Sequence, residues 1–241
     1  MRSSLAVVAC ACLLVSGCGG APSPLPAAPS PAPAVTSPSP TVSAGLVERL
    51  RRGGLVLYLR HTATETTQDA PTPDLSDPAT QRNLSAEGRA QAREIGQAVR
   101  RLRIPIGEVL ASPYRRTVET AELAFGRAQV TRELLNEAYP GTDDDQLAAG
   151  LRRLLTGRPR PGVNTVLVSH GFNLAGATGL SSAEGDTFVF APGGEEPVAR
   201  IGVHDWRSVN DLGLRPRACK SVHMNHEEVC DSLGRSSPGS S

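Results

Sequence analysis

Apolar positions follow two patterns along the central part of the chain. Continuous apolar runs, which are typical of strands buried on both faces of a sheet, occupy 55–59, 109–111 and 163–168. Apolar residues with the spacing of an amphipathic helix occupy 46–50, 95–102 and 147–155. Two further short strands are expected at 187–190 and 198–203. Because strands alternate with helices, we expect an α/β fold with three layers, α/β/α, and a mostly parallel sheet.

Residues that favour helix ends support these assignments. Ser43 and Ser85 can cap two helices through their side chains, and Gly53-Gly54 can end the first of them. Ser112-Pro113 is expected to begin another helix, and a further helix is expected at 171–180. Helices therefore separate the first four strands from one another.

The first 17 residues have the composition of an export signal. A positive start at Met1-Arg2 precedes an apolar run at 5–15, which is too short to span a bilayer as a helix. The run ends in Val15-Ser16-Gly17-Cys18, which resembles the lipobox of bacterial lipoproteins. Residues 1–17 are therefore interpreted as a lipoprotein signal peptide and Cys18 as the lipidation site. A plain secretory signal that contains a cysteine by chance is the alternative.

Residues 18–43 continue from the lipidated cysteine as a linker rich in proline, alanine and serine. Such a composition favours extended polyproline II, with a reach of roughly 75 Å at about 3.1 Å per residue. A proline-rich ligand for a partner module is the alternative interpretation. We expect a folded domain at 44–213, a flexible tail at 214–241, and lipid anchoring to a bacterial membrane at its periplasmic or outer face.

The charge balance limits the kinds of partner that the chain can attract. Its 241 residues carry a formal net charge of +1 at pH 7. This gives no long-range attraction to nucleic acid or to a membrane surface. Contact with a membrane is therefore expected only through the lipid. An anionic substrate would have to be bound by local arginines. The sequence predicts no particular oligomeric state.

Basic and imidazole side chains follow the three continuous apolar runs. Arg60 and His61 follow the first run, Arg115 and Arg116 the second, and His170 the third. Because ligand sites in open α/β sheets lie outside the carboxyl ends of the strands, these side chains are expected at one edge of the sheet. Arginine can bond two phosphate oxygens at once, so the set predicts a pocket for a tetrahedral dianion. A solvated charge on a helix is the alternative interpretation for Arg116, and it is the expected one for Arg115.

Four motifs follow one another along this part of the chain. They are Leu57-Tyr58-Leu59-Arg60-His61-Thr62, Asn83-Leu84-Ser85-Ala86-Glu87-Gly88, Ser112-Pro113-Tyr114-Arg115-Arg116-Thr117 and Val168-Ser169-His170-Gly171. Together they resemble the motifs of the histidine phosphatase superfamily, which includes the phosphoglycerate mutases. The resemblance covers roughly residues 55–203 and implies a phosphoglycerate mutase-like fold. The segments between the motifs are short, so any cap over the site should be small or absent.

The resemblance implies a metal-independent phosphohydrolase, either a phosphomonoesterase or a phosphoramidase, that uses no cofactor. His61 would attack phosphorus and become phosphohistidine. Arg60 and Arg116 would bind the phosphate oxygens, and His170 would complete the pocket. The expected partner is a phosphorylated substrate whose identity the sequence does not specify.

A carboxyl group must also protonate the leaving oxygen. Glu137, which follows Leu134-Leu135-Asn136, resembles the acid of the family. Its rivals are Glu65, Glu133, Asp143 and Asp144. Two further side chains are candidates for substrate contact. These are Thr62, at a position where the best-known members carry glycine, and Asn173, for which an ordinary helix start is the alternative.

Other functions fit parts of the pattern. A non-catalytic envelope lipoprotein could use the same pocket to hold a phosphorylated ligand. A metallohydrolase could use His61, His170 and a carboxylate, although the sequence lacks a local pair such as His-x-x-x-His. A mutase is disfavoured because an exported domain on a stalk would not meet glycolytic intermediates.

The tail contains two cysteines and two histidines in the pattern Cys219-x3-His223-x2-His226-x3-Cys230. A Cys219–Cys230 disulfide is expected in an exported protein. A zinc site is the second interpretation, although the spacing matches neither usual finger pattern. A disordered tail with neither is the third.

Overall fold

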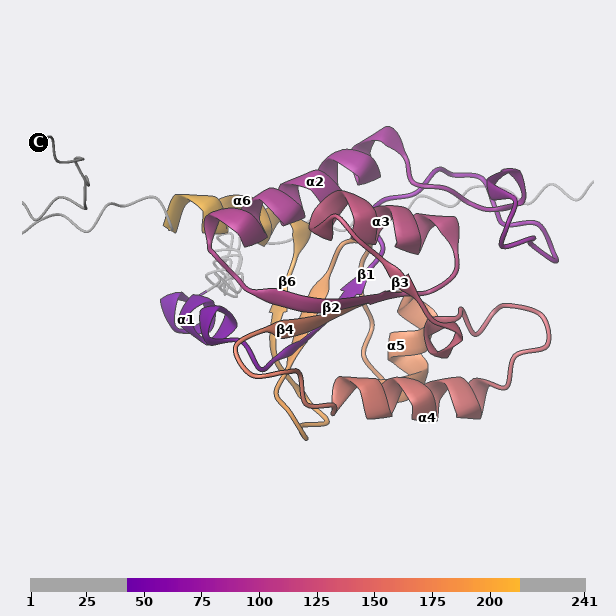
Figure 1. Cartoon of the computed structure of the whole chain (residues 1–241). Coiled ribbons are helices and arrows are strands. Elements are labelled where there is room, and N and C mark those ends of the chain that lie inside the picture. The colour runs from indigo at the N-terminus through magenta and orange to yellow at the C-terminus, as the bar shows by residue number, and fades with distance from the viewer. Residues whose placement is uncertain (1–42, 213–241) are drawn as a thin grey trace, which may run out of the picture. The chain divides into compact units, whose positions relative to one another are not determined.

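Six strands form the sheet at the centre of residues 43–212, the part of the chain that this computed structural model describes (Figure 1). The strands are β1 Val56–Arg60, β2 Ile106–Ala111, β3 Gln129–Val130, β4 Asn164–Ser169, β5 Thr187–Phe190 and β6 Pro197–Ile201. Their order across the sheet is β3-β2-β4-β1-β5-β6. The pairs β1–β4, β2–β4 and β2–β3 are parallel, whereas β5 runs antiparallel to both β1 and β6. The expected α/β fold with a mostly parallel sheet is confirmed.

Helices cover both faces of this sheet, and Figure 1 shows α2, α3 and α6 on the side opposite to α4 and α5. The α-helices are α1 Ala44–Arg52, α2 Ala86–Arg101, α3 Arg115–Phe125, α4 Asp144–Leu155, α5 Gly171–Thr178 and α6 Val203–Leu212. Two short 3-10 helices, η1 Pro78–Thr80 and η2 Arg132–Leu134, lie in the connections. As expected, Ser43 and Ser85 cap α1 and α2 by accepting hydrogen bonds from backbone N–H groups.

Two apolar cores flank the sheet because successive strand residues point to opposite faces. Leu57 and Leu59 of β1 contribute to the core beneath α1, α2, α3 and α6. Val56 and Tyr58 contribute to the core beneath α4 and α5. A strand with apolar residues on both faces must lie in the middle of the sheet, which places the carboxyl end of β1 between β4 and β5.

Several expected elements have different bounds, and others were not predicted. The strand expected at 198–203 ends at Ile201, because Gly202 donates its N–H to the Asp205 carboxylate and so begins α6. The helix expected at 147–155 begins three residues earlier, after Asp143 caps it. The unpredicted α6 inserts Trp206, which is 1% exposed, into the first core. The unpredicted β3 has only two residues, both exposed.

Several expectations fall on residues outside the described part of the chain. These are the signal peptide at 1–17, the lipidation site Cys18, nearly all of the linker at 18–43, and the tail at 214–241 with Cys219 and Cys230. They stay predictions. Within residues 43–212, no helix has the length and apolar character needed to cross a membrane.

Candidate active site

The carboxyl ends of β1, β2 and β4 lie side by side. Arg60 stands opposite Ser169 in the register of β1 and β4, and the next residue, His61, donates its N–H to Ser169 O at 3.0 Å. On the other side of β4, Ser112 donates its N–H to Val168 O at 3.0 Å. The three strand ends are therefore locked at one level, as the sequence predicts, although their motifs are far apart along the chain.

The start of α2 fixes the chain that follows His61. Ser85 N donates to Ala63 O at 3.0 Å, and the Gln91 side chain accepts from Ala63 N at 3.1 Å. A Cβ atom at Gly88 would lie 1.9 Å from Ala63 O, so only glycine permits this approach. The glycine in the second motif thus serves to hold the backbone beside His61.

His61 is almost completely buried, with 1% of its surface exposed. Its Nδ1 lies 3.0 Å from Thr62 O, and a carbonyl oxygen can only accept a hydrogen bond. Nδ1 therefore carries the proton, and Nε2 of the neutral ring keeps its lone pair. An imidazole that attacks through Nε2 would need this tautomer.

His170 lies beside His61, with 5.5 Å between the two ring centroids. Its Nε2 is 2.8 Å from Ser112 Oγ, and Tyr58 donates its hydroxyl proton to His170 O at 2.6 Å. The other ring nitrogen, Nδ1, is buried without a hydrogen-bond partner. If the Ser112 hydroxyl donates to Nε2, then Nδ1 carries a proton that can bind an anion.

Arg60 and Arg116 each bury an Nε atom that also has no partner. Arg116 is 1% exposed, and its guanidinium lies 4.2 Å from the centroid of the Tyr114 ring. The Arg60 guanidinium bonds Ser182 O and lies against Gly171, where a Cβ atom would be 2.9 Å from Nη1. Buried polar atoms without partners are rare in native proteins and call for an explanation. An oxyanion bound beside His61 would give partners to the three nitrogens on Arg60, Arg116 and His170.

Burial and the arginines keep both histidines neutral. Desolvation, followed by the charge of Arg116, holds the pKa of His61 well below the ordinary value of 6.5. The same two causes, in the same order, lower the pKa of His170. Neutral His61 retains the Nε2 lone pair at and below neutral pH.

This electrostatic arrangement predicts the position of an acid limb in the pH profile. Activity should be lost only when His61 is protonated, as the pH falls through its lowered pKa. The acid limb of kcat/KM, which reports the free enzyme, should therefore lie below pH 6.5 after correction for the ionisation of the substrate. A limb at or above pH 6.5 would contradict this account of His61.

The structure adds charged residues that the sequence did not single out. Asp69, from the loop after β1, accepts from Arg116 Nη1 at 2.9 Å and from Arg82 N at 2.7 Å. Glu184, from the loop before β5, places Oε1 3.9 Å from His61 Nδ1 and 3.9 Å from Nη2 of Arg82. Both carboxylates and Arg82 lie on irregular segments, where no periodicity signals their position. Only the place of Arg82 directly before the second motif could have suggested its role.

Glu137 lies outside this cluster. Its loop is held by the Asn173 side chain, which donates to Leu135 O at 2.6 Å. A Cβ atom at Gly176 of α5 would be 2.4 Å from Glu137 Oε1, so the carboxyl group rests against that helix. Desolvation, followed by the charge of Asp144, raises the pKa of Glu137. The direction of this shift suits a proton donor, but no described ion pair joins Glu137 to the arginines.

The other sequence candidates have structural partners. The Thr62 hydroxyl lies 3.2 Å from the Thr120 hydroxyl and is fully buried. Of the rival acids, Asp143 caps α4, and Glu65, Glu133 and Asp144 are exposed. Arg115 lies on the surface and pairs with Glu122. Among residues 43–212, no group of three or more His, Cys, Asp or Glu side chains is arranged to hold a metal ion.

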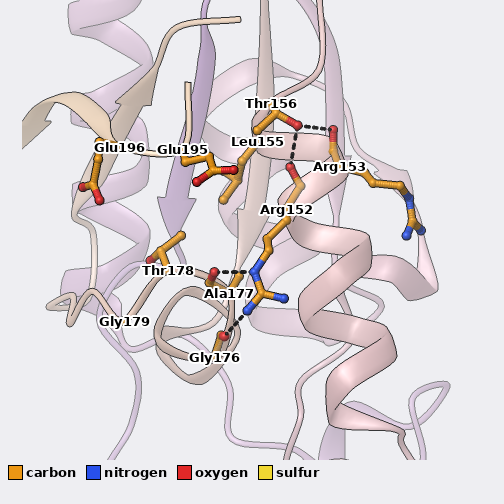
Figure 2. Close-up of a pocket in the computed structure, with 10 residues that line it drawn as sticks. All are labelled: Arg152, Arg153, Leu155, Thr156, Gly176, Ala177, Thr178, Gly179, Glu195 and Glu196. Atoms are coloured by element: carbon orange, nitrogen blue, oxygen red, sulfur yellow. Dashed lines mark hydrogen bonds between the residues drawn. The ribbon is translucent and has the colours of Figure 1, made fainter. Parts of the chain in front are cut away.

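A pocket of about 510 Å³ lies at the other end of the sheet (Figure 2). It is lined by the carboxyl ends of α4 and α5 and by the turn between β5 and β6. This turn follows Phe190, which pairs with Val56 at the start of β1. Arg152 crosses from α4 to the carbonyls of Gly176 and Ala177. The pocket contains no histidine or cysteine among its lining residues, so it offers no nucleophile of the kind found at the carboxyl ends of the strands.

Comparison with known proteins gives one family match. Residues 56–159 match the histidine phosphatase superfamily (branch 1). The matched segment extends from β1 past the end of α4 and includes Arg60, His61, Arg116 and Glu137, whereas His170 lies beyond it. No curated protein sequence matches the chain at a significant level.

Several solved structures are similar at low sequence identity. A mycobacterial glucosyl-3-phosphoglycerate phosphatase is 18% identical, with 56% of this chain and 89% of that chain covered and a TM-score of 0.41. The protein histidine phosphatase SixA in complex with tungstate is 18% identical, with 63% and 98% covered and a TM-score of 0.43. A phosphoserine phosphatase from Entamoeba histolytica is 14% identical, with 56% and 89% covered and a TM-score of 0.40.

Proposed function

We propose that this protein is a metal-independent phosphohydrolase that acts on phosphomonoesters or phosphoramidates through a phosphohistidine at His61. One observation carries the proposal. Nδ1 of His61 is bound to Thr62 O, the charges of Arg60 and Arg116 act on the ring, and the His170 ring lies beside it. Each of these three neighbours has a buried nitrogen without a partner. The match to the histidine phosphatase superfamily supports the same activity.

The chemistry follows from the charges at the site. In phosphoryl transfer, negative charge spreads over three equatorial oxygens, so cations in fixed positions stabilise the transition state. Arg60 and Arg116 supply those charges directly, and His170 donates a further hydrogen bond from Nδ1. His61 Nε2 attacks in line with the leaving oxygen, and water later hydrolyses the phosphohistidine.

Glu137 is the proposed general acid. Burial raises its pKa, and its Oε1 has no hydrogen-bond partner, whereas Asp69 is already paired with Arg116. A carboxyl group with a raised pKa is a better proton donor to the leaving oxygen and can later take a proton from water.

Hydrolysis of matched aryl and alkyl phosphates, with a chelator present throughout, tests both proposals. We expect turnover of p-nitrophenyl phosphate to persist with the chelator. An alkyl leaving group must be protonated as it departs, whereas an aryl leaving group needs this far less. Glu137→Gln should therefore slow hydrolysis of the alkyl phosphate by about 100-fold and hydrolysis of the aryl phosphate far less. Equal losses on both substrates would exclude Glu137 as the acid. Loss of turnover on chelation would contradict a metal-independent reaction, and phosphate binding without turnover would favour the binding-lipoprotein alternative.

We further propose that the domain acts at the cell envelope, anchored through lipid on Cys18. The sequence pattern of residues 1–43 supports this proposal. In cell fractionation, the wild-type chain should sediment with membranes and the Cys18→Ser chain should not. Identical fractionation of the two would contradict the anchor.

A further inference from the structure

The carboxylate of Glu184 lies on the Nδ1 side of the His61 ring, away from Nε2, the proposed attacking atom. Its Oε1 lies 3.9 Å from His61 Nδ1, the nitrogen that carries the proton. Thr64 holds both carboxylate oxygens, because its hydroxyl donates to Oε1 at 2.8 Å and its backbone N–H donates to Oε2 at 3.2 Å. The next residue, Gly185, donates its N–H to His61 O at 3.0 Å. The carboxylate is thus fixed relative to the ring.

The charge of His61 changes during the proposed reaction, and the inference rests on that proposed function. Nε2 forms a bond to phosphorus while the bond from phosphorus to the leaving oxygen breaks. The electron pair of the broken bond goes to the leaving oxygen, which takes a proton from the general acid. The ring has given up a lone pair but keeps the Nδ1 proton, so it gains a positive charge.

The arginines that act most strongly on His61 oppose that new charge. Arg60, Arg82 and Arg116 are the cations whose charges act on the ring, and neutral His170 brings no compensating charge. Asp69 is committed to Arg116 at 2.9 Å. Glu184 therefore supplies the negative charge next to Nδ1, and it also lies 3.9 Å from Nη2 of Arg60.

We propose that Glu184 is a positioning residue that stabilises the positively charged ring of the phosphohistidine. Before attack the ring is neutral, and its interaction with the carboxylate is weak. As the bond to phosphorus forms, the attraction grows, so Glu184 stabilises the transition state more than the ground state. The same charge keeps the Nδ1 proton in place while water attacks phosphorus, so that the electron pair returning to Nε2 leaves a neutral imidazole.

Glu184→Gln in the full chain tests this role, because glutamine keeps the size of the side chain and can still bond Thr64. In rapid-quench experiments with p-nitrophenyl phosphate, phosphoenzyme formation should slow by about 10- to 100-fold. This is less than the usual loss of a directly bonded donor, because Glu184 is partly exposed. KM should stay unchanged or fall, because the variant removes a negative charge near a phosphate site. Glu184→Asp should restore part of the rate.

A second readout is the pH dependence of phosphoenzyme hydrolysis, which should fall when Nδ1 of the phosphohistidine loses its proton. Without the Glu184 charge, this alkaline limb should move down by about one pH unit, at the lower end of the shift from a charge within 4–6 Å. The matched control is Glu119→Gln, which removes a carboxylate that pairs with Arg89 and Arg115 and forms no described ion pair with either histidine. Its rate and limb should equal those of the wild type.

The outcomes separate this role from the proposed function. An unchanged limb, or a rise in KM that accounts for the loss, would show that Glu184 only holds the arginines and would overturn the inference. Wild-type turnover without any phosphohistidine would instead overturn the proposed function, on which the inference rests.

Discussion

Replacement of His61 by alanine should reduce turnover of p-nitrophenyl phosphate by at least about 10,000-fold, the scale of loss seen when a catalytic nucleophile is removed. The reason is that Nε2 of His61 keeps a lone pair, whereas Nε2 of the other buried imidazole, His170, is bound to the Ser112 hydroxyl. The remaining activity would come from the arginines alone. Steady-state assays over a wide range of enzyme concentration measure the loss.

The matched control is His204→Ala, because His204 is an exposed histidine on α6. It should keep wild-type turnover. Since His61 is buried, His61→Gln is measured as well, and both variants are checked for a wild-type melting transition. A folded His61 variant that retains a tenth or so of wild-type turnover, well above the usual residue left by such substitutions, would contradict the nucleophile assignment.

Arg116→Lys should lower kcat/KM by about 1,000-fold although the charge is kept. Lysine presents a point charge and lacks the buried Nε that, in Arg116, has no protein partner. It also cannot reproduce the contact of the guanidinium with the Tyr114 ring. The effect should appear mainly in kcat, because in the proposed reaction the arginine bonds the equatorial oxygens most strongly in the transition state.

Arg115→Lys provides the control at the neighbouring position. The Arg115 side chain is 41% exposed and pairs with Glu122 on the surface, so kcat/KM should change by no more than about twofold. Equal losses in the two variants would show that α3 as a whole is sensitive and that Arg116 has no special role. Melting temperatures identify any loss that comes from the broken pair with Asp69.

The parts of the site that could be predicted from sequence lie where a regular element ends. Continuous apolar runs are followed, within a few residues, by His61, Arg116 and His170. The topology of a parallel sheet brings such positions together. Serine caps gave the start of α1 and α2 for a similar reason, because a cap is a local interaction between neighbouring residues.

The remaining parts depend on contacts between distant loops. Asp69 reaches Arg116 across 47 positions of the chain, and Glu184 reaches Thr64 across 120 positions. Neither loop has a periodic pattern, so the sequence does not predict that these carboxylates lie at the site. The same limit applies to Glu137, whose motif is local but whose placement depends on how Asn173 ties its loop to α5.

The C-terminal helix shows how one residue can alter the assignment of a segment. The apolar residues at 198–203 alternate as in a strand, but Gly202 and Asp205 begin a helix there. The strand therefore stops at Ile201. Trp206 of this helix is buried in the core, and its Nε1 donates a hydrogen bond to Thr187 Oγ1 at 3.2 Å.

The central claim, that His61 carries the phosphoryl group, is tested most directly by trapping the intermediate. The full chain is mixed with a radiolabelled aryl phosphate, quenched in alkali during turnover, digested and sequenced by mass spectrometry. We expect an alkali-stable, acid-labile phosphoryl group on Nε2 of His61, absent in His61→Ala. Turnover without a labelled histidine, or label on another residue, would contradict the account.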